Sequence, residues 1–300
     1  MRTEFFLLNL SFSHSEGISI ENIEEAVNVL SDDYDFIKVN QDRISRNEAI
    51  YDVNIYENYK IEDLYYVNKP CPFSRDTKKF LLKIIDHSKE TSWTNSEAFE
   101  LINQQENENL CLSKSNYGLL ALFKVSDMID ERYIVYNKRN WLAFHRHFLS
   151  KYPCDSAYFM DECARYFPNL YFHERNKNTV GRILVTCVGK IIHHLSALND
   201  IFPYCKAVPY NRMDTMRRFN SESNFDRDAS IEGDIDRKKH LSFDFINSNE
   251  KSEKMYCELH LKLIYDDLGA YSQDRRIYFH EGKPTISEGK ILVGHIGEHL

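Results

Sequence analysis

The stretch Met255-Tyr-Cys-Glu-Leu-His-Leu-Lys-Leu263 alternates apolar and polar residues throughout. A period of two is typical of a β-strand that buries one face and exposes the other. Met255 and every second residue after it as far as Leu263 are apolar, and we expect this set to face a core. The polar set between them, which includes His260 and Lys262, is expected to lie together on the opposite face.

Three further stretches near this strand alternate in a similar way: Leu241-Ser-Phe-Asp-Phe245, Arg276-Ile-Tyr-Phe-His280 and Lys290-Ile-Leu-Val-Gly-His295. Glycines in the connections favour sharp turns between consecutive strands. We therefore predict a curved antiparallel sheet of about four strands. A helix from the preceding segment is expected to cover one of its faces.

The whole chain predicts an α+β protein with three regions: a mixed α/β N-terminal region at 1–136, a helical segment at 137–204 and the C-terminal β module at 205–300. In the first region, residues 5–12, 34–68 and 132–136 suggest short strands. Ser19 and Thr94 precede amphipathic helical patterns and are suited to cap them. The longest apolar helical repeat runs from residue 180 to residue 199.

A polar segment of mixed charge precedes the predicted sheet. Residues 220–240 are expected to form a solvated connection. Three charged residues of this segment, Glu222, Arg227 and Glu232, are placed to fold over the polar face of the sheet. Acidic side chains there would hold a basic site shut until a partner displaces them.

The composition limits the classes of function. The chain has 38 Lys and Arg against 46 Asp and Glu, a net charge of −8, which argues against a broad nucleic-acid or membrane surface but leaves room for a small basic site. The seven cysteines form no CxxC pair, so neither a disulfide framework nor a zinc knuckle is indicated. The N-terminus does not resemble a secretion signal, and no stretch is apolar enough to cross a bilayer. We expect a cytoplasmic protein with no membrane partner.

The polar face of the predicted sheet gathers cationic and imidazole side chains. His260 and Lys262 share a face by strand parity, as do Arg276, Tyr278 and His280, and the two sets would meet if their strands are neighbours. Lys and Arg neutralise a phosphate, and His moves protons near pH 7, so this combination suits a phosphodiester. The alternative is an ordinary solvent-facing sheet surface without a ligand.

The C-terminal strands carry three short motifs: Glu258-Leu-His-Leu-Lys-Leu263, Arg276-Ile-Tyr-Phe-His280 and Gly289-Lys-Ile-Leu-Val-Gly-His-Ile-Gly297. They resemble the "ELR", "YRIFYF" and "IVLLHGF" strands of the RelE/ParE/HigB toxin superfamily. The resemblance implies a RelE-like sheet packed on helices, and cleavage of messenger RNA by basic and aromatic residues instead of a metal. Arg276 matches the family's strand arginine and His295 the histidine of its last strand, whereas His260 stands where arginine is usual. The whole chain also resembles larger bacterial proteins of unassigned role that are linked to phage defence.

The residue types and the resemblance together predict a metal-independent endoribonuclease without a cofactor. His260 or His280 would deprotonate the ribose 2′-hydroxyl, and the other histidine would protonate the leaving oxygen. Arg276 and Lys262 would stabilise the charge that develops on the phosphorane. His295 completes the candidate catalytic set. The candidate substrate-binding residues are Tyr278, Tyr256 and His299, of which the tyrosines would stack on bases.

Two other classes of function remain open. A non-enzymatic binding protein would use the same sheet to dock on the ribosome, a nucleic acid or a protein partner. If the chain is instead the toxin-like enzyme, we expect a protein partner that restrains it. A metal-dependent hydrolase would need the histidines of the helical middle, which lack a diagnostic spacing such as HExxH. We expect structural roles for them, with His194 in the core and His193 on the surface. The histidines concerned are His145, His147, His173, His193 and His194.

Overall fold

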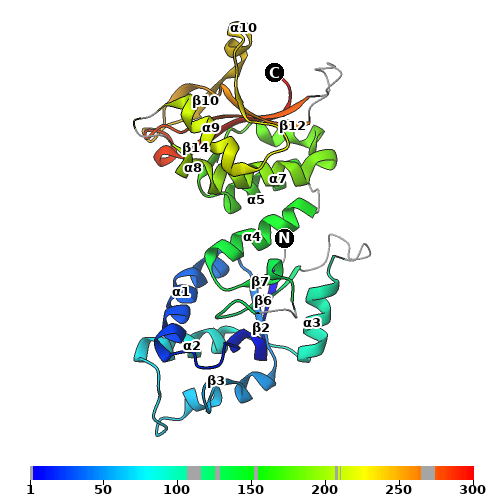
Figure 1. The fold of residues 1–300 in the computed structure, drawn as a ribbon. Coiled ribbons are helices and arrows are strands. Elements are labelled where there is room, and N and C mark those ends of the chain that lie inside the picture. The colour runs from blue at the N-terminus through cyan, green and yellow to red at the C-terminus, as the bar shows by residue number, and fades with distance from the viewer. Residues whose placement is uncertain are drawn as a thin grey trace. The chain divides into compact units, whose positions relative to one another are not determined.

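The computed structural model describes residues 3–106, 116–125, 129–151, 155–206, 209, 211–264 and 274–300. The chain divides into two compact units, Met1–His147 and Phe148–Leu300, and each contains helices and strands (Figure 1). The mixed α+β class is therefore confirmed. The division falls within helix α4 (Lys138–Lys151), so the helical segment expected at 137–204 does not form a region of its own.

The N-terminal unit is built on a five-stranded sheet in which every neighbouring pair of strands is parallel. The order across the sheet is β5-β2-β1-β6-β7. The bounds are β1 (Thr3–Leu7), β2 (Arg43–Arg46), β5 (Lys89–Glu90), β6 (Asn116–Leu120) and β7 (Ile134–Val135). The chain builds from β1 to β5 on one side and then returns to add β6 and β7 on the other side of β1. The direction of winding therefore reverses between β1 and β6.

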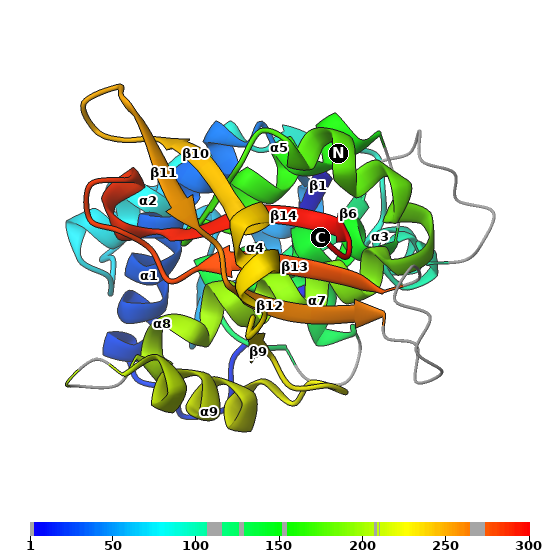
Figure 2. The same ribbon diagram turned by 90° about the horizontal axis from the view of Figure 1, so that it is seen from above.

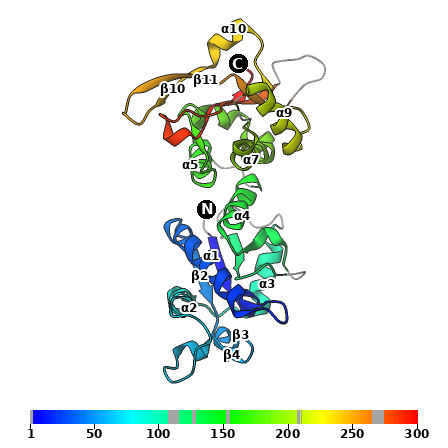
Figure 3. The same cartoon turned by 60° about the vertical axis from the view of Figure 1, so that its left-hand side comes forward.

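Three helices in the connections of this sheet flank it, with α1 and α2 on one side and α3 on the other (Figures 1 and 3). Their bounds are α1 (Ile20–Val39), α2 (Arg75–His87) and α3 (Asn95–Gln104). The unit also contains a small hairpin, β3 (Asn54–Tyr56) and β4 (Tyr59–Lys60), and the 3-10 turns η1 (Asn9–Phe12), η2 (Glu48–Asp52), η3 (Glu62–Tyr65) and η4 (Glu131–Tyr133).

The predicted helix caps are present, but the predicted strands are shorter than expected. The Ser19 side chain caps α1, and Thr94 forms a capping box with Glu97 at the start of α3. The expected strand at 5–12 ends at Leu7, where a 3-10 turn follows. Residues 35–39 belong to α1 instead of a strand, because Ile37 continues the buried stripe of that helix.

The C-terminal unit is built on a second five-stranded sheet, in the order β8-β14-β13-β12-β9. Figure 2 shows β14, β13, β12 and β9 of this sheet. The bounds are β8 (Leu170–Phe172), β9 (Ser230–Ile231), β12 (Leu259–Ile264), β13 (Arg275–His280) and β14 (Ile291–Glu298). The neighbours from β14 to β9 are antiparallel, and β8 adds a parallel edge beside β14. Strand β9 lies in the segment expected to be a connection, so part of that segment joins the sheet.

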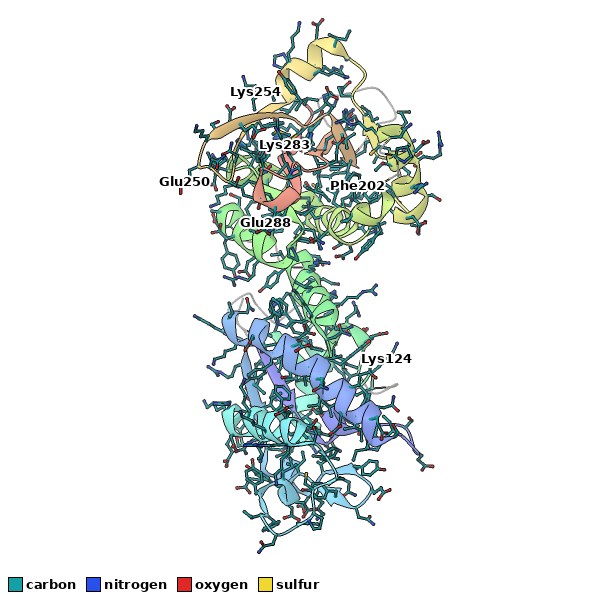
Figure 4. The ribbon with its side chains drawn as sticks, turned by 90° about the vertical axis from the view of Figure 1, so that its left-hand side faces the viewer. Lys124, Phe202, Glu250, Lys254, Lys283 and Glu288 are labelled. Carbon is teal, nitrogen blue, oxygen red and sulfur yellow. The ribbon has the colours of Figure 1, made fainter. Side chains whose placement is uncertain are left out.

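Helices from the preceding segment cover one face of this sheet. Phe202 (labelled in Figure 4) packs edge-on against Phe219 and against Phe279 of β13, with ring centroids 5.1 and 5.3 Å away. The helices of the unit are α5 (Ser156–Tyr166), α6 (Asn176–Thr179), α7 (Leu184–Asp200), α8 (Phe202–Cys205), α9 (Arg212–Ser223) and α10 (Ile235–Lys238). The 3-10 turns are η5 (Val180–Arg182), η6 (Lys239–Leu241) and η8 (Ser287–Gly289).

A separate hairpin, β10 (Ser242–Ile246) and β11 (Ser252–Tyr256), packs on the other face of the sheet. The stretch 255–263, expected to be one strand, is therefore divided between β11 and β12. Cys257 belongs to the core between the hairpin and the sheet, together with Tyr278 and Leu292. Leu259 instead lies opposite Phe279, on the face that the helices cover. Apolar residues of one alternating stretch therefore pack into two different cores, one on each face of the sheet.

The hairpin packs closely against the sheet at Gly294 of β14, where there is no room for a side chain. A Cβ atom there would lie 2.5 Å from the Phe243 ring and 2.8 Å from Cys257 Sγ. We expect Gly294→Ala to lower the free energy of unfolding of the C-terminal unit by roughly 1–3 kcal/mol, because the hairpin must shift. Urea unfolding measures this. Gly233→Ala, whose Cβ would meet nothing within 4 Å, is the control, and equal stabilities of the two variants would contradict the described packing.

Candidate functional site

The register of the C-terminal sheet brings most of the expected site residues together. Lys262 of β12 lies directly opposite Arg276 of β13, and His260 lies opposite Tyr278. Tyr278 is in turn opposite His295 of β14. These five residues form two adjacent cross-strand rows on the sheet face opposite Phe202, the face over which α10 lies (Figure 2), and we call them the histidine–arginine cluster. Strand parity alone predicts this juxtaposition, because the strands are neighbours.

Arg276 is the centre of the cluster and is itself almost fully buried, with 6% of its surface exposed. Its Nη1 atom lies 3.3 Å from His260 Nε2, and its Nη2 atom lies 3.3 Å from Asp274 Oδ2. Glu232 Oε2 is 3.9 Å from Nη1. Since a guanidinium only donates, His260 Nε2 accepts the hydrogen bond and the proton of the neutral ring is on Nδ1. The cation is therefore paired on several sides within the protein.

The aromatic ring of Tyr278 separates the two buried imidazoles. Its centroid lies 5.5 Å from that of His260 and 6.1 Å from that of His295. His299, beyond the end of β14, also contacts this ring, at 6.5 Å. His295 Nε2 donates to the backbone carbonyl of Glu298 at 2.9 Å, which fixes the tautomer and the orientation of that ring.

Burial dominates the protonation of the cluster. It lowers the pKa of His260 to about 3, with the neighbouring Arg276 adding to the effect. It also lowers the pKa of His295 to about 4. The pKa of Lys262 is lowered as well, first by burial and then by Arg276. At pH 7 the two imidazoles are neutral, so they are able to accept a proton but hold none to donate as imidazolium.

Two acidic residues pair with Arg276, the central cation of the cluster. Asp274, in the backbone segment that leads into β13, is nearly inaccessible. Glu232 follows β9, and its backbone N–H donates to the carbonyl of Glu258 at 2.8 Å, which holds its side chain over the sheet. Glu232 is one of the charged residues expected to fold over this face. Asp274 is not among the residues predicted from the sequence. Its position two residues before Arg276 would have placed it on the same face of the strand.

Three expected site residues lie outside the cluster: His299, which contacts the Tyr278 ring, and, further away, His280 and Tyr256. The imidazole of His280 accepts from the backbone N–H of Gly282 at 3.1 Å and lies near an ion-pair network on which Arg212 is central. Arg212 contacts Glu281 at 2.7 Å and Glu258 at 2.9 Å. Tyr256, the last residue of β11, is half exposed on the hairpin. The hairpin position explains this, because β11 is not a strand of the main sheet.

The histidines of the helical middle make structural contacts. His145 Nε2 lies 3.2 Å from Asp42 Oδ2 in the N-terminal unit. His194 donates from Nδ1 to the carbonyl of Lys190 at 2.7 Å and stacks on Phe225, whereas His193 is exposed, as predicted. Among the described residues, no group of three or more His, Cys, Asp or Glu side chains is placed to hold a metal ion. Within the same residues, no helix has both the length and the apolar character required to cross a bilayer.

Comparisons of this chain with protein-family models, with curated proteins and with solved structures give no match.

The depressed pKa of His295 predicts a pH dependence of stability. In the unfolded chain this imidazole titrates near its ordinary pKa of about 6.5, so below that pH the unfolded state binds a proton that the folded state does not. Stability is therefore fully present above pH 6.5 and decreases as the pH falls from there toward 4. Between pH 7 and pH 5 we expect His295 to account for a loss of about 2 kcal/mol.

His295→Gln should therefore make the C-terminal unit less sensitive to pH by that amount. Urea unfolding followed by the amide NMR signals of β13 and β14 at pH 7 and pH 5 measures the difference. His193→Gln, which removes an exposed histidine from α7, is the matched control. An unchanged pH dependence in His295→Gln would show that this imidazole is not held neutral in the folded state.

Proposed function

We propose that this chain is a toxin-like or anti-phage defence effector of the cytoplasm, and that its C-terminal unit is a RelE-like endoribonuclease module in a closed state. The supporting observation is the cross-strand pair of Lys262 and Arg276, together with imidazoles on the same face. In the proposed closed state, Glu232 and Asp274 take the place of the phosphate. Opening replaces the Glu232 carboxylate with a phosphodiester of single-stranded RNA.

The stability of the fold gives no reason for this pair of cations. Like charges directly opposite each other in a sheet are destabilising. Burying a cation has a desolvation cost that its acidic partners offset only in part. Proteins with apolar residues of similar size at such positions are often at least as stable. A sheet face that carries Lys262 and Arg276 beside His260 is therefore better explained by an anionic ligand than by packing.

The chemistry follows from the positions in the cluster. With Glu232 displaced, Arg276 and Lys262 bind the phosphate and stabilise the negative charge of the phosphorane. His260 accepts the proton of the ribose 2′-hydroxyl as that oxygen attacks phosphorus, and the bond from phosphorus to the 5′-oxygen breaks. Solvent entry raises the pKa of His295 toward its ordinary value, so that it is able to protonate the leaving 5′-oxygen. The products are a 2′,3′-cyclic phosphate and a 5′-hydroxyl.

The element that carries Glu232 is suited to release. Strand β9 has only two residues and lies at the edge of the sheet, where it pairs with Leu259 and His260. Few backbone hydrogen bonds hold it, and such segments belong to the low-stability part of a fold. A protein partner that binds this segment in its closed form would restrain the enzyme, and RNA that competes for Arg276 would open it.

A second candidate, a non-enzymatic RNA- or ribosome-binding protein, is favoured by the burial of His260 and His295. Both imidazoles are neutral at pH 7 in the closed state. If they remain so when RNA binds, the cluster provides phosphate binding by Arg276 and Lys262 without an acid for the leaving group. The two candidates share the same opened surface and differ only in whether RNA is cut.

Glu232→Gln tests the proposal, because it removes a carboxylate from the Arg276 pairing with little change in shape. We expect cleavage of single-stranded RNA by the purified protein to rise about tenfold, the factor that corresponds to roughly 1.4 kcal/mol of lost closing free energy. Expression of the variant should arrest growth. Asp236→Asn is the matched control, since Asp236 lies four residues further along and pairs with Lys239. Adding Arg276→Ala to Glu232→Gln should abolish the gain.

Other outcomes of this experiment are equally decisive. RNA binding that strengthens in Glu232→Gln without cleavage would reject the enzyme and favour the binding protein. A Glu232→Gln protein that is folded by circular dichroism but neither binds nor cleaves RNA more than Asp236→Asn would overturn both candidates.

A further inference from the structure

The N-terminal unit contains a cavity of about 620 Å³ at one edge of its parallel sheet; the cavity is open to solvent, and its acidic residues Glu16 and Glu25 are exposed. Its walls come from the chain that follows β1, from the first turns of α1, and from the residues directly after β6 and β7. The lining includes residues 15–19, Asn22 and Glu25 of α1, residues 122–123 and residues 136–137. All of these segments lie at the carboxyl ends of the strands or just beyond them.

The position of this cavity is the one at which open parallel sheets bind ligands. The winding of the chain reverses between β1 and β6: the strand that follows β1 lies on one side of it, and β6 and β7 are added on the other side. A crevice opens at the carboxyl ends of strands at such a reversal, and ligands of doubly wound proteins bind there. The volume also lies within the range of roughly 300–1,000 Å³ that is usual for small-molecule sites.

The charges around the cavity disfavour a phosphate. Among the described residues that line it, Glu16 and Glu25 are acidic and none is Lys or Arg. The two lysines next to the lining are engaged elsewhere: Lys124 (labelled in Figure 4) pairs with Glu131 at 2.6 Å, and Lys138 Nζ lies 3.8 Å from the centroid of the Phe36 ring. A phosphorylated ligand would meet two carboxylates without a compensating cation.

The start of α1 is also supplied with an anion from the protein. The pKa of Glu21 is lowered, chiefly because its carboxylate accepts a hydrogen bond from its own backbone N–H. An acidic residue of the protein therefore already lies in the first turn, at the positive end of the helix dipole. The ligand of this cavity does not need a negative charge.

The remaining lining suits a planar ring that carries hydroxyl groups. Phe123 and Tyr136 are half-buried aromatic side chains in the wall, able to stack on a base. Phe123 is supported from behind by His14, whose ring centroid is 6.4 Å away and whose Nε2 bonds to the carbonyl of Ile55 at 3.0 Å. The carboxylates of Glu16 and Glu25 are strong acceptors for ribose hydroxyls.

We infer that this cavity binds a nucleoside, through stacking of the base on Phe123 or Tyr136 and hydrogen bonds from the ribose to Glu16 or Glu25. The ligand is neutral or cationic and carries no phosphate. This binding site belongs to the N-terminal unit alone, so it stands independently of the ribonuclease proposed for the C-terminal unit.

Isothermal titration calorimetry of the full chain tests this inference with adenosine, guanosine, cytidine and uridine and with their 5′-monophosphates. We expect at least one nucleoside to bind and its monophosphate to bind about tenfold more weakly, because the phosphate approaches two carboxylates. Glu25→Gln should weaken nucleoside binding about tenfold, since a charge-assisted hydrogen bond is lost. Ala26→Trp should also weaken it, because the indole occupies part of the cavity beside Glu25.

Asp35→Asn is the matched control, because Asp35 is an exposed acid of the same helix that does not line the cavity. Absence of heat with all four nucleosides at millimolar concentration would overturn the inference. So would tighter binding of the monophosphates, or equal affinities in Ala26→Trp and Asp35→Asn.

Discussion

The pairing of Arg276 inside the C-terminal sheet is the constraint on which the proposed function depends. A buried guanidinium must be matched by acceptors, and here they are an imidazole nitrogen of His260 and the carboxylates of Asp274 and Glu232. The same contacts that make this arginine tolerable in the fold also neutralise it toward a ligand. The acceptor on the short edge segment, Glu232, is the one that a small local opening removes.

The two units place their candidate sites by different structural rules. In the C-terminal unit, antiparallel register brings side chains of β12, β13 and β14 into one patch on a face of the sheet. In the N-terminal unit, the site is a cavity at the carboxyl edge of a parallel sheet, where the winding reverses. The electrostatics of the two sites differ accordingly. The C-terminal cluster is built around the cations Lys262 and Arg276. The N-terminal cavity is lined by Glu16 and Glu25, and none of its described lining residues is Lys or Arg.

The sequence predicts local features well and layers less well. Alternation identifies which of His260, Lys262, Arg276 and Tyr278 share a face, because side-chain direction depends only on strand parity. It does not show that the chain changes layers at Cys257, since apolar residues continue on both sides of that change. The parallel sheet of the N-terminal unit also escapes prediction, because its strands are only two to five residues long and carry little periodicity. Its cavity arises from segments that are far apart in sequence, so no single motif marks it.

A crystal structure of the protein with a short RNA that contains a 2′-deoxy nucleotide at the scissile position tests the central claim most directly. This substitution removes the attacking hydroxyl and leaves the phosphate in place. We expect a phosphate of the RNA within hydrogen-bond distance of Arg276 and Lys262, with the Glu232 carboxylate displaced from the guanidinium. An RNA bound elsewhere, with Glu232 still facing Arg276, would contradict the assignment of this cluster as a phosphodiester site.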